Sequence, residues 1–166
     1  DALSDLNSAL GGKALEGIDL GNAYRIRGEV YRRMGRYGEA VADIDQAIAV
    51  DPQNALAYHT RGYIHLNQGD CVSAIRDLDQ AIALAPTLWR PYAVRGLASI
   101  ERKAYNAAIP DLTKALELGP RDARLYFERG KAYALQGHYI AARWDWRMAS
   151  QLAGPEPVGE LARKGI

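Results

Sequence analysis

The sequence predicts an all-α chain in which antiparallel helix pairs stack into an α-solenoid. The first observation is an Arg-Gly dipeptide that recurs every 34 residues. A fixed period of this size indicates stacked supersecondary units. The second observation is a series of stretches with apolar residues at helical spacing, and the third is a glycine or proline between most of them. No stretch has the pattern of a β-strand.

Residues 1–20 are predicted to hold the second helix of an incomplete repeat, followed by a longer linker. Residues 2–10 have the apolar pattern that residues 40–48, 74–82 and 108–116 repeat. The spacing from Ala9 to Ala47 exceeds the period by four residues. The extra length falls in the glycine-rich linker, which has room for a short helical turn around residues 14–17.

Four repeats are predicted next, each with a helix A, a tight turn, a helix B and a breaker. They span residues 21–54, 55–88, 89–122 and 123–154. In helix B of the first repeat, apolar residues from Ala40 to Ile48 form one stripe. Residues 155–166 are predicted to be a tail or a short capping helix, since Val158 and Leu161 could cover the last repeat. Trp144 is expected to face outward, beneath this tail or at an oligomer contact.

Glycines and prolines mark where the helices end. Gly35, Gly69 and Gly137 fit a left-handed C-cap after helix A, and Lys103 takes that place in the third repeat. Proline disfavours helical geometry in the residue before it. The prolines predicted to end helix B are Pro52, Pro86 and Pro120. The predicted N-caps of the next helices are Asn54, Thr87 and Asp122. Pro91 and Pro110 are predicted to lie in first turns, where the missing N–H does little harm.

The Arg-Gly pairs predict two structural roles. A glycine inside a helix costs ~1 kcal/mol relative to alanine, so its recurrence indicates close approach of another helix. The recurring pairs are Arg27-Gly28, Arg61-Gly62, Arg95-Gly96 and Arg129-Gly130. A charge on a half-buried helix face needs a partner, and aspartate recurs at the same period. The aspartates are Asp5, Asp43, Asp77, Asp111 and Asp145. We therefore expect a ladder of structural Arg–Asp pairs within or between repeats.

Several further positions hold one residue type when each repeat is numbered from its first residue. Position 4 is always tyrosine, position 8 glycine, and positions 20 and 27 alanine. Position 24 is large and apolar, and proline fills position 32 in three repeats. These residues resemble the tetratricopeptide repeat (TPR) family over nearly the whole chain. Arginine at position 7 departs from the family, which has leucine there.

The resemblance implies a right-handed superhelix whose concave face is lined by the A helices. Positions 2, 5, 9, 12 and 13 carry ligands in many family members. The candidate peptide-binding residues carried over from them are Arg25, Arg32, His59, Tyr63, Leu66, Asn67, Arg90, Leu97, Phe127 and Lys131. The centre of this surface is apolar and its edges are basic, which favours a protein or peptide with an apolar stripe and acidic flanks.

The apolar candidates on this surface have an alternative interpretation. Leu66, Ile100 and Leu135 could instead pack between helices, whereas Tyr63 and Phe127 are expected to be exposed. Some family members clamp a C-terminal carboxylate with basic residues and asparagines. This chain departs from that pattern at Glu29, Thr60 and Val94, so we expect no such clamp.

The sequence predicts no enzyme activity, catalytic residue, metal or cofactor. The three histidines show no metal-ligand spacing with Cys71 or with one another, and Cys71 is expected to be a packing residue. A net charge of +1 argues against nucleic-acid binding, and no apolar run approaches the length that spans a membrane. The single cysteine excludes an internal disulfide and leaves the compartment open.

The predicted function is a protein–protein interaction scaffold that binds a peptide or helix in its concave groove. One alternative is a self-associating structural module. The other is an accessory array of a larger protein whose other domain is absent from this chain.

Overall fold

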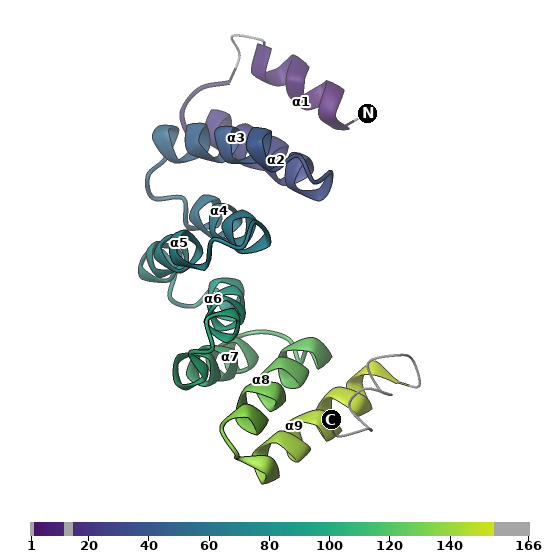
Figure 1. Ribbon diagram of the computed structural model, residues 1–166. Coiled ribbons are helices and arrows are strands. Elements are labelled where there is room, and N and C mark those ends of the chain that lie inside the picture. Colours follow the sequence, from purple (N-terminus) through teal and green to yellow (C-terminus); the bar gives the residue numbers. More distant parts are fainter. Residues whose placement is uncertain (1, 12–14, 155–166) are drawn as a thin grey trace. The chain divides into compact units, whose positions relative to one another are not determined.

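The structure is a computed structural model that describes residues 2–11 and 15–154, and every regular element in those ranges is a helix (Figure 1). The helices are α1 (Ala2–Gly11), α2 (Gly17–Arg33), α3 (Tyr37–Val50), α4 (Ala55–Asn67), α5 (Cys71–Leu84), α6 (Trp89–Glu101), α7 (Tyr105–Leu118), α8 (Ala123–Leu135) and α9 (Tyr139–Ala153).

The chain divides between Ala85 and Pro86 into two compact units. In the N-terminal unit, α2 pairs with α3 and α4 with α5, while α1 packs on α2 and α3 on α4. In the C-terminal unit, α6 pairs with α7 and α8 with α9, while α7 packs on α8. Each pair is joined by a short turn (Figure 1). Each unit thus contains two complete helix pairs of the predicted kind.

The recurring glycines lie where the two helices of a pair cross, as predicted. A Cβ added to Gly62 would lie 2.9 Å from Leu78 Cγ and 3.1 Å from the backbone oxygen of Ala74. Gly28, Gly96 and Gly130 meet the same obstruction, with their nearest neighbours at 2.7–2.8 Å. The cost of a helical glycine is therefore offset by a closer approach of helix B than any side chain at that position would permit.

The core of each unit is built from small residues at the crossings and larger residues between them. In the N-terminal unit, Ile44 and Ile64 are fully buried among alanines. In the C-terminal unit, Leu112 and Leu125 pack in the same way, and Trp146 takes the place of the aliphatic residue in α9. Because helices of neighbouring pairs contribute to one cluster, a pair does not bury its apolar stripe alone.

The tight turns after the A helices follow the prediction. Gly35, Gly69 and Gly137 have φ of 74°, 81° and 80°, which is the left-handed region that glycine adopts without strain. Lys103 has φ of 59° at the equivalent place in the third repeat. The turn geometry is therefore kept where the preferred residue is missing, at a conformational cost.

Three predictions about helix ends were wrong. The linker was predicted to extend to residue 20, but α2, the first helix of the first complete repeat, already begins at Gly17. Thr87 does not cap α6, which begins after Leu88 without a side-chain cap. Pro110 is the sixth residue of α7 and so lies beyond its first turn, where it removes one backbone hydrogen bond.

The other predicted caps were correct. The side chain of Asn54 accepts a hydrogen bond from the backbone N–H of Ala57, and that of Asp122 from Arg124. Pro91 is the third residue of α6, within its first turn. Residues 155–166, including the predicted capping helix, lie outside the described residues.

Candidate protein-interaction site

The recurring arginines and aspartates form the predicted ladder. In every complete repeat, Nε and Nη2 of the arginine on helix A donate to the two carboxylate oxygens of the aspartate on helix B, at 2.7–2.8 Å. The pairs are Arg27–Asp43, Arg61–Asp77, Arg95–Asp111 and Arg129–Asp145. The aspartates are buried, so this fork-to-fork geometry keeps each charge compensated.

The remaining guanidinium nitrogen links a repeat to the one before it. Nη1 of Arg27 donates to Asn7 on α1, Nη1 of Arg61 to Asp45 on α3, and Nη1 of Arg129 to Thr113 on α7. The hydrogen bonds from Arg61 to Asp77 and Asp45 raise its pKa above the ordinary value despite burial. One arginine thus ties three helices together, so this residue belongs to the frame.

The geometry that recurs in each repeat also includes the tyrosine three residues before each arginine. The guanidinium carbon lies 5.5–5.8 Å from the ring centroid of this tyrosine in all four repeats. The rings concerned are those of Tyr24, Tyr58, Tyr92 and Tyr126. Such a contact is typical of a cation–π interaction, and it adds a ring contact to the arginine of every complete repeat.

The A-helix face of the N-terminal unit carries a charged and aromatic cluster. Arg32 on α2 stacks over the ring of Tyr63 on α4, with its guanidinium carbon 4.7 Å from the centroid. Arg32 also donates two hydrogen bonds of 2.7 Å to Glu29, and Arg33 adds one of 3.0 Å. Burial opposes ionisation of Glu29, but these bonds hold its pKa below the ordinary value. The structure therefore joins Arg32 and Tyr63, two of the predicted binding residues.

Arg25 on the same helix has an unsatisfied donor. Its Nε is buried and has no hydrogen-bond partner among the described residues. A buried N–H without an acceptor costs about 1–3 kcal/mol, so a water, an ion or another acceptor that reaches this nitrogen would stabilise the arrangement. Of the other candidates in this unit, His59 and Leu66 are half-buried and Asn67 is exposed.

The four candidates in the C-terminal unit lie on α6 and α8. Arg90 is exposed, with its guanidinium carbon 5.0 Å from the ring centroid of Trp89, and Leu97 is half-buried. Phe127 is half-buried against the cluster formed by Ala142 and Trp146, so much of its ring contributes to packing. Lys131 lies 3.8 Å from Glu128.

The structure decides between packing and surface exposure for two of the apolar residues that had both interpretations. Ile100 is 6% exposed and belongs to the core, whereas Leu135 is 54% exposed. Leu66 and Tyr63 lie between these extremes as half-buried residues. Ile100 is therefore a packing residue, and Leu135 is free for an intermolecular contact.

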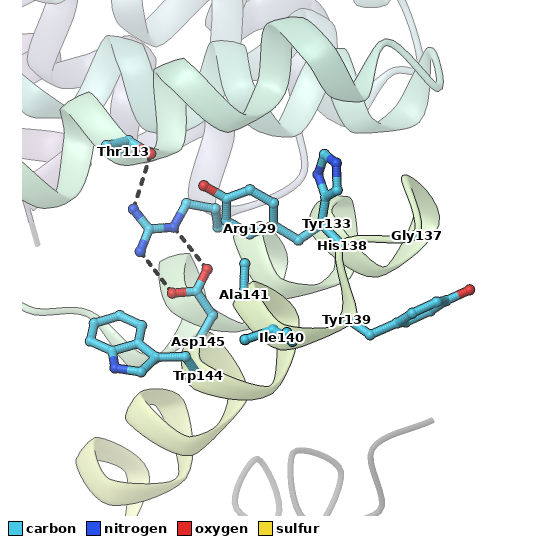
Figure 2. A pocket seen from close by; sticks show the side chains of 10 residues that line it. All are labelled: Thr113, Arg129, Tyr133, Gly137, His138, Tyr139, Ile140, Ala141, Trp144 and Asp145. Atoms are coloured by element: carbon cyan, nitrogen blue, oxygen red, sulfur yellow. Dashed lines mark hydrogen bonds and ion pairs between the residues drawn. The ribbon is translucent and has the colours of Figure 1, made fainter.

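A pocket of about 860 Å³ in the C-terminal unit was not predicted from the sequence (Figure 2). Its floor comes from Arg129 and Tyr133 of α8, and its walls from Thr113 of α7 and from Ile140 and Trp144 of α9. Figure 2 shows Arg129 pointing toward Thr113 and Asp145, with the ring of Tyr139 directed away from them. Two apolar residues in helical register, Ile140 and Trp144, were the available sequence signal.

Other kinds of site find no support in the part of the chain that the structure covers. Residues 2–11 and 15–154 contain no group of three or more His, Cys, Asp or Glu side chains placed to hold a metal ion. None of the helices in these ranges combines the length and the apolar character needed to cross a bilayer.

A model of the TPR repeat matches residues 28–69 and 96–137, which together make up half of the chain. The chain belongs to the TPR repeat family. Its fold is an all-α solenoid of helical repeats, as the solved structures of similar proteins also show. No curated protein matches the sequence.

Three of these solved structures are similar over most of this TPR chain. MamA from Desulfovibrio magneticus RS-1 is 20% identical, with a TM-score of 0.78, over 91% of this chain and 83% of MamA. YrrB, described as a TPR protein with an unusual peptide-binding site, is 18% identical, with a TM-score of 0.77, over 90% and 75%. The first TPR of Spaghetti (RPAP3), bound to an HSP90 peptide, is 22% identical, with a TM-score of 0.71, over 73% and 98%. At such identities the likeness shows the fold alone.

Proposed function

We propose that this TPR chain is a protein-interaction scaffold that binds a peptide or helix on the exposed faces of its A helices. The observation that carries the proposal is the buried Nε of Arg25, which has no acceptor among the described residues. A peptide carbonyl or carboxylate laid along α2 would supply that acceptor once the Arg25 side chain turns to expose Nε. Repeat folds of this kind offer extended surfaces for such ligands.

The neighbouring side chains suggest what the ligand looks like. Leu56 of α4 is 39% exposed, and Tyr63 is half-buried beneath Arg32. An apolar residue of the ligand would pack against Leu56 and Tyr63, and an acidic residue would meet Arg25. This combination supports a ligand with an apolar stripe and acidic flanks.

Two similar proteins support peptide binding as the general mode. YrrB is described as having a peptide-binding site, and the Spaghetti TPR is bound to the HSP90 peptide SRMEEVD. The same ligand is not expected here, because Glu29 already receives the hydrogen bonds of Arg32 and Arg33. A carboxylate at that place would repel the C-terminal carboxylate of such a peptide. The absence of the clamp thus remains a prediction.

The test is selection from a displayed peptide library, followed by affinity measurement on the strongest binders. Replacing Arg25 by glutamine removes the charge and Nε, whereas Arg25→Lys keeps the charge alone. We expect a loss of at least about tenfold for Arg25→Gln and a smaller loss for Arg25→Lys, since a charge-assisted hydrogen bond is worth about 1.5–3 kcal/mol. Arg36→Gln, at an exposed turn residue paired with Glu39, is the matched control.

Unchanged affinity in Arg25→Gln would refute the proposal for this face. A separate double variant, Tyr63→Ala with Arg90→Glu, extends the test to one residue of each unit. If peptides still bind this double variant like the parent chain, the A-helix faces are not the site.

Self-association is the second candidate function. The observation that favours it is apolar exposure on α2, where Ile18 is 67% and Ile26 44% exposed, and on the following residue Met34, which is 55% exposed. Light scattering across a range of concentrations tests it directly. A monomer at every concentration would remove this candidate.

A further inference from the structure

The helix α2 is longer than the other A helices by one turn. It has 17 residues, whereas α4, α6 and α8 have 13 each, and the extra turn precedes Gly21, which is equivalent to the first residue of those helices. Ile18 in this turn is 67% exposed, and Glu16 and Asp19 beside it are also exposed. Neither carboxylate forms an ion pair within the described ranges. The turn therefore presents an apolar side chain between two negative charges.

The pocket in the C-terminal unit offers an apolar surface with different surroundings. Its wall on α9 includes Ile140, which is 90% exposed, and Trp144, which is 54% exposed (Figure 2). The acidic residue of its lining is Asp145, whose carboxylate is buried and bonded to Arg129. A volume of about 860 Å³ leaves room for more than one side chain. The pocket can therefore receive an apolar group without placing a free carboxylate against it.

The corresponding place in the N-terminal unit has a different charge. Where the pocket is lined by Thr113 and His138, the equivalent residues of the N-terminal unit are Asp45 and Asp70. Both of these aspartates are exposed. A segment with acidic flanks that fits the C-terminal unit would therefore be repelled at the equivalent place of the N-terminal unit.

Two exposed arginines flank the apolar wall of the pocket. Arg143 lies three residues after Ile140, and Arg147 lies three residues after Trp144. Residues at this spacing are neighbours on a helix surface. Neither guanidinium forms an ion pair with a residue that the structure describes. The wall thus presents apolar side chains beside two positive charges.

The two units carry opposite net charges. Among the described residues, the N-terminal unit has eleven acidic and seven basic residues, and the C-terminal unit has six acidic and eleven basic ones. Two copies of the chain therefore attract each other when the N-terminal unit of one approaches the C-terminal unit of the other, whereas like units repel. This distribution of charge favours a head-to-tail contact between copies.

We propose that the first turn of α2 in one copy of the chain docks in the pocket of a second copy, where Ile18 packs against Ile140 and Trp144. This contact rests on self-association, the second candidate function above, and names the two surfaces that carry it. Because the two surfaces differ, each copy contributes one of them to a contact and keeps the other for a further copy.

The charges around the docked side chain fit the same arrangement. Glu16 and Asp19 are three residues apart, and Arg143 and Arg147 are four residues apart, so the members of each set are separated by about one helical turn. Both carboxylates can therefore pair with a guanidinium while Ile18 is docked. A symmetric contact of either surface with itself would instead oppose like charges.

The test is sedimentation velocity of the full chain over a range of concentrations, with two variants that each damage one surface. Ile18→Glu keeps the pocket, and Ile140→Glu keeps the first turn of α2. Each variant alone should associate at least about tenfold more weakly than the parent chain, since a charge in an apolar contact must be desolvated. An equimolar mixture should form a dimer with one copy of each, because the intact turn of one variant docks in the intact pocket of the other.

Met34→Glu is the matched control, since Met34 follows the other end of α2 and is 55% exposed. This variant should associate like the parent chain. All three substitutions are at exposed residues, so the thermal unfolding of the variants should match that of the parent. Weaker association of Met34→Glu than of Ile18→Glu would place the contact at the other end of α2 and overturn the proposal.

Three further results would overturn the proposal and separate it from the functions above. A parent chain that stays monomeric at every concentration excludes self-association together with this contact, and leaves the peptide-binding scaffold unaffected. Association that persists in Ile18→Glu or in Ile140→Glu keeps self-association but places it on other surfaces. If the two variants are monomeric alone and also when mixed, the two surfaces do not bind each other.

Discussion

The arginine of the second repeat and that of the fourth occupy the same frame in different surroundings. Arg61 in the N-terminal unit bonds to two carboxylates, those of Asp77 and Asp45. Arg129 in the C-terminal unit bonds to Asp145 and to the neutral hydroxyl of Thr113. The frame is thus held constant by one pair of residues, while the third contact varies.

The same comparison holds for the surface beside each arginine. In the N-terminal unit, the B helix carries Val72 and Arg76 at the positions where α9 carries Ile140 and Trp144. In the C-terminal unit, Ile140 and Trp144 at these positions line an apolar pocket. We therefore expect ligand contacts at the positions that vary between repeats, since the side chains that recur in every repeat are already engaged in contacts between helices.

The largest effect should come from removing the carboxylate that each arginine shares within its repeat. Asp145→Ala leaves Arg129 with the hydroxyl of Thr113, whereas Asp77→Ala leaves Arg61 with Asp45. Breaking a buried pair costs about 3–5 kcal/mol, and partial exposure of both arginines reduces this. We expect ~2–4 kcal/mol for Asp145→Ala and a smaller loss for Asp77→Ala, measured by urea denaturation. Equal losses would mean that the third contact contributes nothing.

The helix crossings should respond next. Gly62→Leu places a side chain against Leu78, and Gly130→Leu places one against Trp146, whose indole N–H also bonds to the oxygen of Phe127 at 3.3 Å. Overpacking a crossing costs ~1–3 kcal/mol or more. We expect the larger loss at Gly130, because the indole has less freedom to move than the leucine.

The control for the crossings is a glycine with open space around it. A Cβ at Gly38, on α3, meets no atom within 4 Å, so Gly38→Ala should leave the melting temperature unchanged or raise it slightly. If Gly62→Leu melts at the parent temperature, close packing does not explain the recurring glycines.

A smaller effect tests the third contact itself. Thr113→Asp gives Arg129 the second carboxylate that Arg61 has in Asp45. An exposed ion pair contributes about 0.2–1 kcal/mol, so the variant should gain that much stability at low salt and lose the gain at high salt. Destabilisation at low salt would show that the hydroxyl of Thr113 fits this place better than a carboxylate.

The frame could be predicted from the sequence because each of its residues recurs. The period located the crossings at Gly28 and Gly62, and the aspartates at the same period indicated the partners of the arginines. Helix ends were less predictable, since Pro110 and Thr87 occur once each and their effect depends on where the helix begins. Whether α7 can contain Pro110 depends on the residue at which the helix begins, and the proline itself does not determine that residue.

The pocket beside Trp144 was beyond sequence reasoning for a different reason. Trp144 was expected to face outward, and it does so with 54% of its surface exposed. The floor beneath it comes from Tyr133 and Arg129 of another helix. The spacing of residues along α9 contains no information about that floor. Likewise, the unsatisfied Nε of Arg25 depends on side-chain burial, which a repeat pattern does not specify.

The smallest effect concerns the A-helix faces of the two units. Glu29 receives hydrogen bonds of 2.7 Å from Arg32, whereas Glu128 lies 3.8 Å from Lys131. Since the pKa of Glu29 is held below its ordinary value of 4.5, its ionised form stabilises the fold above that pH, and the contribution is lost as the pH falls through the lowered pKa. Glu29→Gln should therefore cost about 0.3–0.5 kcal/mol at pH 7, as expected for ion pairs within one helix.

The same substitution should cost less at pH 2.5 than at pH 7, because the contribution of ionised Glu29 is lost as the pH falls through its lowered pKa. Glu128→Gln is the matched control, with a loss at pH 7 that is smaller because its ion pair is longer. Urea denaturation of the parent and both variants at the two pH values measures the difference. A loss in Glu29→Gln that persists unchanged in acid would show that Glu29 supports Arg32 and Tyr63 through packing rather than through its charge.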